Sequence, residues 1–182
     1  MKLREIKKLI TFRKKISAAI QTVDHSREIA KKRLPRSVWD FIDGGAGEEH
    51  AIKANRTTLD DVIFQPKYLV DVSKPDTSLT IFGKPISNPL ILSPSGLATL
   101  AHPEGEIAAA RAAHQAGAIF CLSTGSGNSI EEVAQESQGR LWFQLYLWKS
   151  QQVIDSLIER SKASGYEALI VTVDVPVVGK RE

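Results

Sequence analysis

Ala118-Ile119-Phe120-Cys121-Leu122 is an apolar run that leads directly into Ser123-Thr124-Gly125. Three further apolar runs also end in polar residues: Leu90–Leu92 before Ser93, Leu141–Phe143 before Gln144, and Ala168–Val171 before Thr172. Apolar helical patterns at 103–116, 129–136 and 151–163 separate the four runs. The sequence therefore predicts the order β-α-β-α-β-α-β, and this alternation is typical of a parallel sheet.

The polar residues that follow the runs indicate where a ligand would bind. The carboxyl ends of parallel strands meet at one edge, so we expect Ser93, Ser123, Gln144 and Thr172 to converge there. Hydroxyl and amide groups suit the carbonyls and ring nitrogens of a neutral heterocycle better than a metal or a phosphate. Polar caps on the strand ends are an equal alternative on the residue types alone.

Four β/α units are half of a (β/α)₈ barrel, the TIM barrel, which usually needs about 250 residues. The chain has 182 residues, so it forms either a small open sheet or part of a barrel. Residues 1–36 hold 12 Lys and Arg against 3 Asp and Glu. We therefore expect a basic arm at 1–25 and a domain at 26–182.

Charge and cysteine content indicate a cellular setting. The basic arm is either a solvated tail or a peripheral contact with an anionic membrane surface. No apolar run is long enough to span a bilayer, and one cysteine, Cys121, is typical of a reducing compartment. We expect a cytoplasmic protein, with membrane association as the alternative, and no nucleic-acid partner. Because Cys121 lies inside an apolar run, it is expected to be buried and not a nucleophile.

Three helices are predicted before the first strand. The first covers 26–33, and the second starts at Leu34-Pro35 and ends at Gly44-Gly45, where glycine can take the left-handed conformation. The third covers 48–58 and has two acids in its first turn. A hairpin at 78–86, with its turn at Gly83-Lys84-Pro85, is expected to close the bottom of the barrel.

The sequence lacks the common motifs for nucleotide binding, zinc binding and serine hydrolysis. The sequence has no G-x-G-x-x-G after a strand, no G-K-[ST] loop, no C-x-x-C and no G-x-S-x-G. His102 and Glu106 are four residues apart but lack a third ligand, so no metal site is expected. We expect His102 to cap the helix that Pro103 begins.

Four stretches together resemble one enzyme family. They are LPRSVWDFIDGGA at 34–46, AHPEGE at 101–106, WFQLY at 142–146, and TVDVP with GKRE at 172–176 and 179–182. They are similar to the FMN-dependent α-hydroxy-acid dehydrogenase/oxidase family, which includes glycolate oxidase, mandelate dehydrogenase and flavocytochrome lactate dehydrogenases. The resemblance runs from about residue 26 to the last residue, in the family's order, and covers the family's N-terminal half.

The resemblance implies a TIM barrel, FMN as cofactor, and oxidation of an (S)-2-hydroxy acid to a 2-oxo acid. It implies that the flavin contacts the backbone of Ser93, Pro94, Ser95 and Gly96 and the side chains of Ser123, Gln144 and Thr172. It also implies catalytic roles for three residues: Tyr146 faces the substrate, Asp174 orients a catalytic histidine, and Arg181 lies near the substrate carboxylate.

The sequence departs from the family at the substrate side. Phe41 stands where many members have a tyrosine that helps to hold the substrate carboxylate. Gly125 replaces a large aromatic residue of glycolate oxidase, and Gly96 replaces an alanine common in the oxidases. We therefore expect a wider pocket and a bulkier substrate.

The family's histidine base and phosphate-binding loops would lie beyond Glu182, so we expect this chain by itself to be inactive. The alternative is a non-catalytic half-barrel, whose open edges favour a homo-oligomer. A third interpretation, another FMN barrel such as an isomerase, requires a phosphate-bearing substrate, and the sequence has no lysine-rich strand end to bind one.

Overall fold

The structure is a computed structural model that describes residues 20, 22–174, 177 and 179–181. The chain divides into two compact units, Met1–Arg56 with Lys180–Glu182, and Thr57–Gly179. Most of the basic arm predicted at 1–25 lies outside the described residues, so that assignment stays a prediction. Among the described residues, no helix has both the length and the apolar character needed to cross a bilayer.

The first unit contains α2 (Val23–Arg33) and α3 (Arg36–Asp43), and α4 (His50–Asp60) begins in it. α2 starts at Val23, earlier than the predicted residue 26. The reason is that the Thr22 hydroxyl accepts the backbone N–H of His25 at 3.1 Å and caps the helix. Pro35 directly precedes α3, which confirms the predicted restart of the chain.

Two predictions about the end of α3 and the start of α4 were wrong. Gly44 ends α3 with φ −84°, so no left-handed glycine closes the helix; the left-handed residues are Gly47 and Glu49. α4 starts only at His50, so the two acids precede it. The Glu49 carboxylate instead accepts the N–H of Gly45 at 2.9 Å, and a Cβ on Gly45 would lie 2.4 Å from Ile52.

The second unit begins with a hairpin of β1 (Leu79–Ile81) and β2 (Lys84–Ile86), as predicted. The turn is Phe82-Gly83, both with positive φ, so Lys84 and Pro85 belong to β2 and not to the turn. The Arg140 guanidinium donates to the carbonyls of Ile81 at 3.0 Å and Lys84 at 3.2 Å. Arg140 directly precedes a sheet strand, so the hairpin lies at the N-terminal end of the sheet.

Four parallel strands follow in the order β3-β4-β5-β6. They are β3 (Ile91–Leu92), β4 (Ile119–Ser123), β5 (Leu141–Tyr146) and β6 (Ala168–Thr172). The connections are η1 (Ala98–Leu100) with α5 (Gly105–Gln115), then α6 (Ile130–Glu136) and α7 (Gln151–Ala163). The predicted β/α alternation is confirmed, and α5, α6 and α7 lie inside their predicted ranges; η1 was not predicted.

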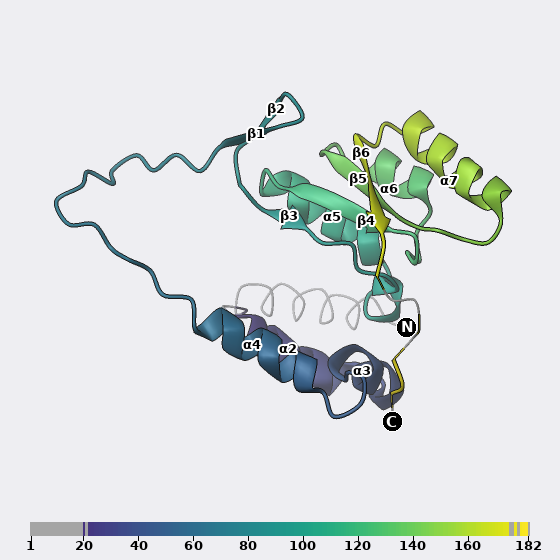
Figure 1. The fold of residues 1–182 in the computed structure, drawn as a ribbon, viewed down its shortest axis with the longest axis horizontal. Helices are drawn as coiled ribbons and strands as arrows, with labels where there is room; N and C mark the ends of the chain where they lie inside the picture. The colour runs from purple at the N-terminus through teal and green to yellow at the C-terminus, as the bar shows by residue number, and fades with distance from the viewer. Residues whose placement is uncertain (1–19, 21, 175–176, 178, 182) are drawn as a thin grey trace, which may run out of the picture. The chain divides into compact units, whose positions relative to one another are not determined.

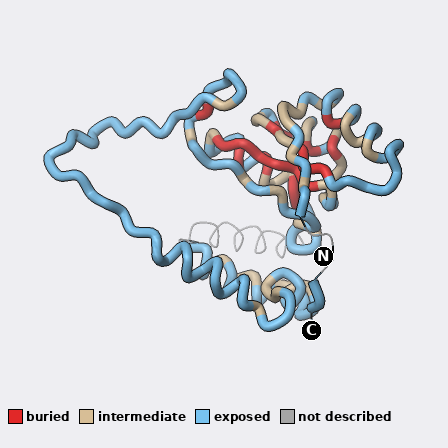
Figure 2. The backbone as a smooth tube through the Cα atoms, viewed as in Figure 1, coloured by how far each residue is buried: buried red, intermediate tan, exposed pale blue. Residues whose placement is uncertain are grey.

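The core lies between the sheet and the three helices, which cover the same face (Figure 1). Figure 2 shows that burial is concentrated in the two central strands, β4 and β5. Their alternate residues Phe120, Leu122, Phe143 and Leu145 pack toward the helices and are almost fully buried. Cys121, on the opposite face of β4, is also buried, as predicted.

Two parts of this unit expose apolar side chains. On the edge strand β6, Leu169 and Val171 are 41% and 45% exposed. The connecting segment, residues 61–78, has no helix or strand, and its Ile63 and Phe64 are 84% and 94% exposed (Figure 2).

Candidate functional site

The side chains of Ser123, Gln144 and Thr172 form a row across the C-terminal ends of β4, β5 and β6. Ser123 pairs with Gln144 in the β4–β5 register, and Thr172 pairs with Tyr146 in the β5–β6 register. Because side chains alternate along a strand, all of them share one face of the sheet. Ser123 and Gln144 are 6% and 2% exposed. The predicted convergence at this edge is confirmed for the row.

Hydrogen bonds fix the orientation of the Gln144 amide. Its Oε1 accepts from the Ser123 hydroxyl at 3.2 Å and from the backbone N–H of Thr124 at 3.1 Å. Its Nε2 donates to the Thr172 hydroxyl at 2.7 Å. Since a backbone N–H can only donate, the amide oxygen must face β4. No described residue accepts a hydrogen bond from the Thr172 hydroxyl, so its proton is available to a ligand at the edge.

The loop after β3 lies against the loop after β4. The N–H of Leu97 donates to the carbonyl of Gly125 at 2.9 Å, and a Cβ on Gly96 would lie 3.0 Å from the same oxygen. A side chain at residue 96 would therefore push the loops apart. Ser93, Ser95 and Gly96 are exposed and Pro94 is half-buried, so this backbone is open to a flat ligand.

Glu106 is a buried residue that our sequence reasoning missed. The sequence places it in the AHPEGE stretch and predicts no metal site there, whereas the structure buries it to 1% exposure. Its Oε1 accepts from the N–H groups of Ala98 at 3.0 Å and Gly127 at 3.3 Å. Its spacing from Ala110 and Ala113 places it on the buried face of α5, and this periodicity was the available signal.

Two other candidates have structural roles. The Nδ1 of His102 accepts the backbone N–H of Glu104 at 3.2 Å, in the turn before α5. The predicted helix cap was wrong, because α5 begins at Gly105 and not at Pro103, and the side chain of its N-cap residue, Glu104, makes no capping bond. Burial raises the pKa of Cys121 to about 11, so its thiol stays protonated at neutral pH. The described residues contain no cluster of three or more His, Cys, Asp or Glu side chains that could hold a metal ion.

The three predicted catalytic residues fall into both units. Tyr146, 45% exposed, ends β5 beside Thr172, and exposed Asp174 follows β6. Both therefore lie near the row. Arg181 belongs to the first unit, where it donates to the carbonyl of Phe41 at 2.7 Å. Its guanidinium lies 5.0 Å from the centre of the Phe41 ring.

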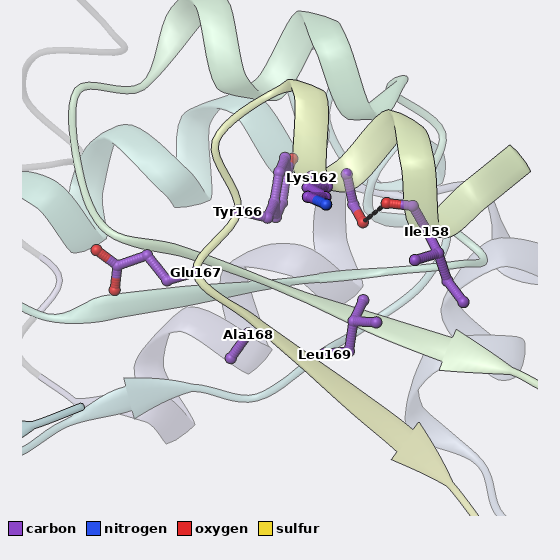
Figure 3. A pocket seen from close by; sticks show the side chains of 7 residues that line it. Ile158, Lys162, Tyr166, Glu167, Ala168 and Leu169 are labelled. Carbon is purple, nitrogen blue, oxygen red and sulfur yellow. Dashed lines mark hydrogen bonds between the residues drawn. The ribbon is translucent and has the colours of Figure 1, made fainter. Parts of the chain in front are cut away.

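A cleft of about 290 Å³ lies between α7 and β6 (Figure 3). It is lined by Ile158, Ser161, Lys162, Tyr166, Glu167, Ala168 and Leu169. The residues from Tyr166 to Ala168 precede or start β6, so the cleft opens at the end of the strand opposite Thr172. It is therefore separate from the row, and it adjoins the exposed Leu169 of the sheet edge.

Comparison with known proteins identifies the family. The family model described as FMN-dependent dehydrogenase matches residues 30–182. The chain belongs to this family. The resemblance noted in the sequence is thereby confirmed, and FMN is the family's cofactor.

Two relatives are identical to the chain at about two fifths of the aligned positions. Glycolate oxidase 1 of Oryza sativa subsp. indica is 42% identical over 163 residues, which are 90% of this chain and 44% of that protein. The peroxisomal (S)-2-hydroxy-acid oxidase GLO4 of the same subspecies is 44% identical over 156 residues, 86% of this chain and 43% of that protein.

A solved structure gives the same result for the fold. A soluble mutant of the membrane-associated (S)-mandelate dehydrogenase from Pseudomonas putida superposes with a TM-score of 0.81 at 41% identity. The superposition covers 86% of this chain and 45% of that one. The expected fold class, a TIM barrel represented by its first four β/α units, is confirmed. The chain spans less than half the length of the relatives it matches.

Proposed function

We propose that this chain supplies the flavin-ring contacts and part of the substrate side of an FMN-dependent enzyme that oxidises an (S)-2-hydroxy acid to a 2-oxo acid. The observation that carries the proposal is the uncharged, hydrogen-bonded row of Ser123, Gln144 and Thr172 beside an exposed glycine-containing loop. The names of the relatives, which include a glycolate oxidase and a (S)-2-hydroxy-acid oxidase, support the same reaction class.

The donor set fits an isoalloxazine ring. The row offers amide and hydroxyl groups of both polarities, which match the carbonyls and nitrogens of the ring. The backbone of 93–96 has no side chain at Gly96 and can lie flat against a planar ligand. Bound FMN would supply the redox chemistry by accepting two electrons, while these residues bind and orient the ring.

We propose substrate-side roles, which the family resemblance implies, for Tyr146 and Asp174 of the second unit and for Arg181 of the first. The exposed phenol of Tyr146 can donate to the substrate, and the Asp174 carboxylate can orient a basic side chain. Arg181 uses one of its five N–H groups on Phe41, which leaves a fork for a carboxylate. The contact also places Phe41, which lacks a phenol, beside the proposed carboxylate-binding arginine.

We further propose that a polypeptide of these 182 residues alone binds flavin weakly and does not turn over. The row carries no charge for a phosphate. The histidines of the second unit make other contacts: His102 accepts the backbone N–H of Glu104, and His114 lies against Gly139. The compartment and the role of the basic arm stay predictions.

The test separates ring binding from phosphate binding. FMN and lumiflavin, which has the ring but no phosphate, are titrated against the chain and flavin fluorescence is followed. We expect similar, weak affinities for both. Gln144→Leu removes the amide that links Ser123 to Thr172 and should weaken the binding of both ligands by about tenfold or more. Gln135→Leu, at an exposed glutamine of α6, should leave both affinities unchanged. Lumiflavin binding that ignores Gln144→Leu would contradict the proposal.

A second candidate function is self-association of the half-barrel. The observation that favours it is the open β6 edge, where Leu169 and Val171 are 41% and 45% exposed beside the cleft of Figure 3. An unpaired strand with apolar side chains recruits another chain, here a second copy. Sedimentation velocity should show association that the double variant Leu169→Lys/Val171→Lys reduces. Val153→Lys on α7, where the side chain is 43% exposed, is the matched control.

A further inference from the structure

We infer that Glu106 is a positioning residue: its buried carboxylate holds the loops after β3 and β4 in the arrangement that presents their backbone to the flavin. The effect on flavin binding rests on the proposed function. The effect on the loops themselves does not.

One oxygen atom connects the two loops. Oε1 of Glu106 accepts from Ala98, the first residue of η1, and from Gly127, which lies in the loop between β4 and α6. The backbone N–H of Glu106 donates in turn to Oδ1 of Asn128 at 3.2 Å. The start of α5 is thus fastened to both loops, and each loop is fastened to the other.

The packing around this connection leaves no slack. A Cβ on Gly127 would lie 2.0 Å from Oγ1 of Thr99, and a Cβ on Gly105 would lie 2.7 Å from Cγ2 of Thr99. The same two loops meet again at Leu97 and Gly125, whose N–H and carbonyl are 2.9 Å apart. The spacing between the backbone at residue 96 and the Ser123 side of the row therefore depends on the Glu106 contacts.

The burial of a carboxylate at this point needs an explanation. Glu106 is 1% exposed, and its Oε2 has no hydrogen-bond partner among the described residues. Burying an incompletely bonded polar group is unfavourable, so native proteins rarely do it without a specific role. Glu106 has such a role, because its Oε1 accepts the backbone N–H groups of both Ala98 and Gly127. Neither N–H group bonds to another acceptor within its own loop.

The experiment compares Glu106→Ala with Glu106→Gln, which keeps the acceptor oxygen. Amide hydrogen exchange is measured by NMR on the 182-residue chain, together with lumiflavin affinity. In Glu106→Ala we expect the amides of Ala98 and Gly127 to exchange about tenfold faster or more, with a fall in lumiflavin affinity of similar size. Glu106→Gln should restore both. Glu104→Ala, at an exposed glutamate beside the same helix start, is the control.

Amides of β4 distinguish a local effect from unfolding. If Glu106→Ala accelerates exchange in β4 as much as at Ala98 and Gly127, or leaves Ala98 and Gly127 unchanged, the inference is overturned. Faster loop exchange with unchanged lumiflavin affinity overturns the positioning role. Absence of lumiflavin binding to the unmodified chain would instead count against the proposed function, and the exchange data would still decide whether Glu106 holds the loops.

Discussion

The hairpin is fastened to the sheet by a cluster around Glu167, which predicts a large effect of Glu167→Gln on stability. The Glu167 carboxylate pairs with Arg140 at 2.6 Å and with Lys84 at 2.7 Å. The side chains of Arg140 and Glu167 are only 17% and 16% exposed, whereas Lys84 is 61% exposed. The Arg140 contact should therefore account for most of the stabilisation.

The expected loss in the free energy of unfolding lies between the values for a buried ion pair and a surface ion pair. Removing one partner of a buried pair destabilises by about 3–5 kcal/mol, and an exposed pair contributes about 0–1 kcal/mol. Glutamine keeps one acceptor oxygen, and Arg140 keeps its bonds to the carbonyls of Ile81 and Lys84. We expect Glu167→Gln to lower the free energy of unfolding by about 2 kcal/mol.

The loss should depend on pH. Burial raises the pKa of Glu167, but the hydrogen bonds and charges of Lys84 and Arg140 lower it more, so the net pKa lies below the usual value of a glutamate. A carboxyl whose pKa is lowered by folding stabilises the protein above its unfolded pKa and loses this effect as pH falls through the folded pKa. The difference between the unmodified chain and Glu167→Gln should therefore shrink below about pH 4.5.

Urea denaturation at equal protein concentrations measures both effects. The control is Glu131→Gln, which removes a two-bond pair with Arg160 whose side chains are 41% and 45% exposed. The arginine lowers the pKa of Glu131 to about 2, but at this exposure solvent screening limits the pair to about 0.5–1 kcal/mol. Equal losses for the two variants, or a Glu167→Gln effect that does not shrink at acid pH, would refute the reasoning.

Three further outcomes are expected. Because burial raises the pKa of Cys121 to about 11, a thiol reagent at pH 8 should label it only after denaturation, and rapid native labelling would contradict this. Gly117→Ala should destabilise more than Gly165→Ala: both sites have positive φ, about 1 kcal/mol of strain each, but only a Cβ at residue 117 meets another side chain, Ser87 at 2.0 Å. In a chimera in which this chain replaces its aligned part of (S)-mandelate dehydrogenase, Phe41→Tyr should raise kcat/KM for glycolate more than for mandelate. A higher kcat/KM for glycolate than for mandelate before the change would contradict the expected preference for a bulkier substrate.

The parallel sheet could be predicted because its signal is local and repeated. β4, β5 and β6 each contain a short apolar run that leads into a polar residue. The geometry of parallel strands then places Ser123, Gln144 and Thr172 together. The start of α4 could not be predicted in this way. Glu49 takes a left-handed conformation because its carboxylate caps Gly45, a contact made only once the turn has folded.

The sequence predicted the site residues that lie on strands, but not the contacts made between loops. The bonds from Glu106 to Ala98 and Gly127 depend on how two loops meet, and no periodic pattern encodes that meeting. The contact between Arg181 and Phe41 joins residues 140 positions apart. Side chains on regular elements follow from sequence spacing, whereas contacts between loops and across distant segments follow from the folded chain.

The exposed segment at 61–78 also has a topological consequence. A protease that cut it once would produce an N-terminal piece holding α2, α3 and α4, and a C-terminal piece holding the hairpin and every sheet strand. The C-terminal piece would still hold Lys180 and Arg181, which bind Gly47 and Phe41 of the N-terminal piece. The cut itself would leave these contacts intact, because the first unit combines its helices with Lys180 and Arg181 from the other end of the described chain.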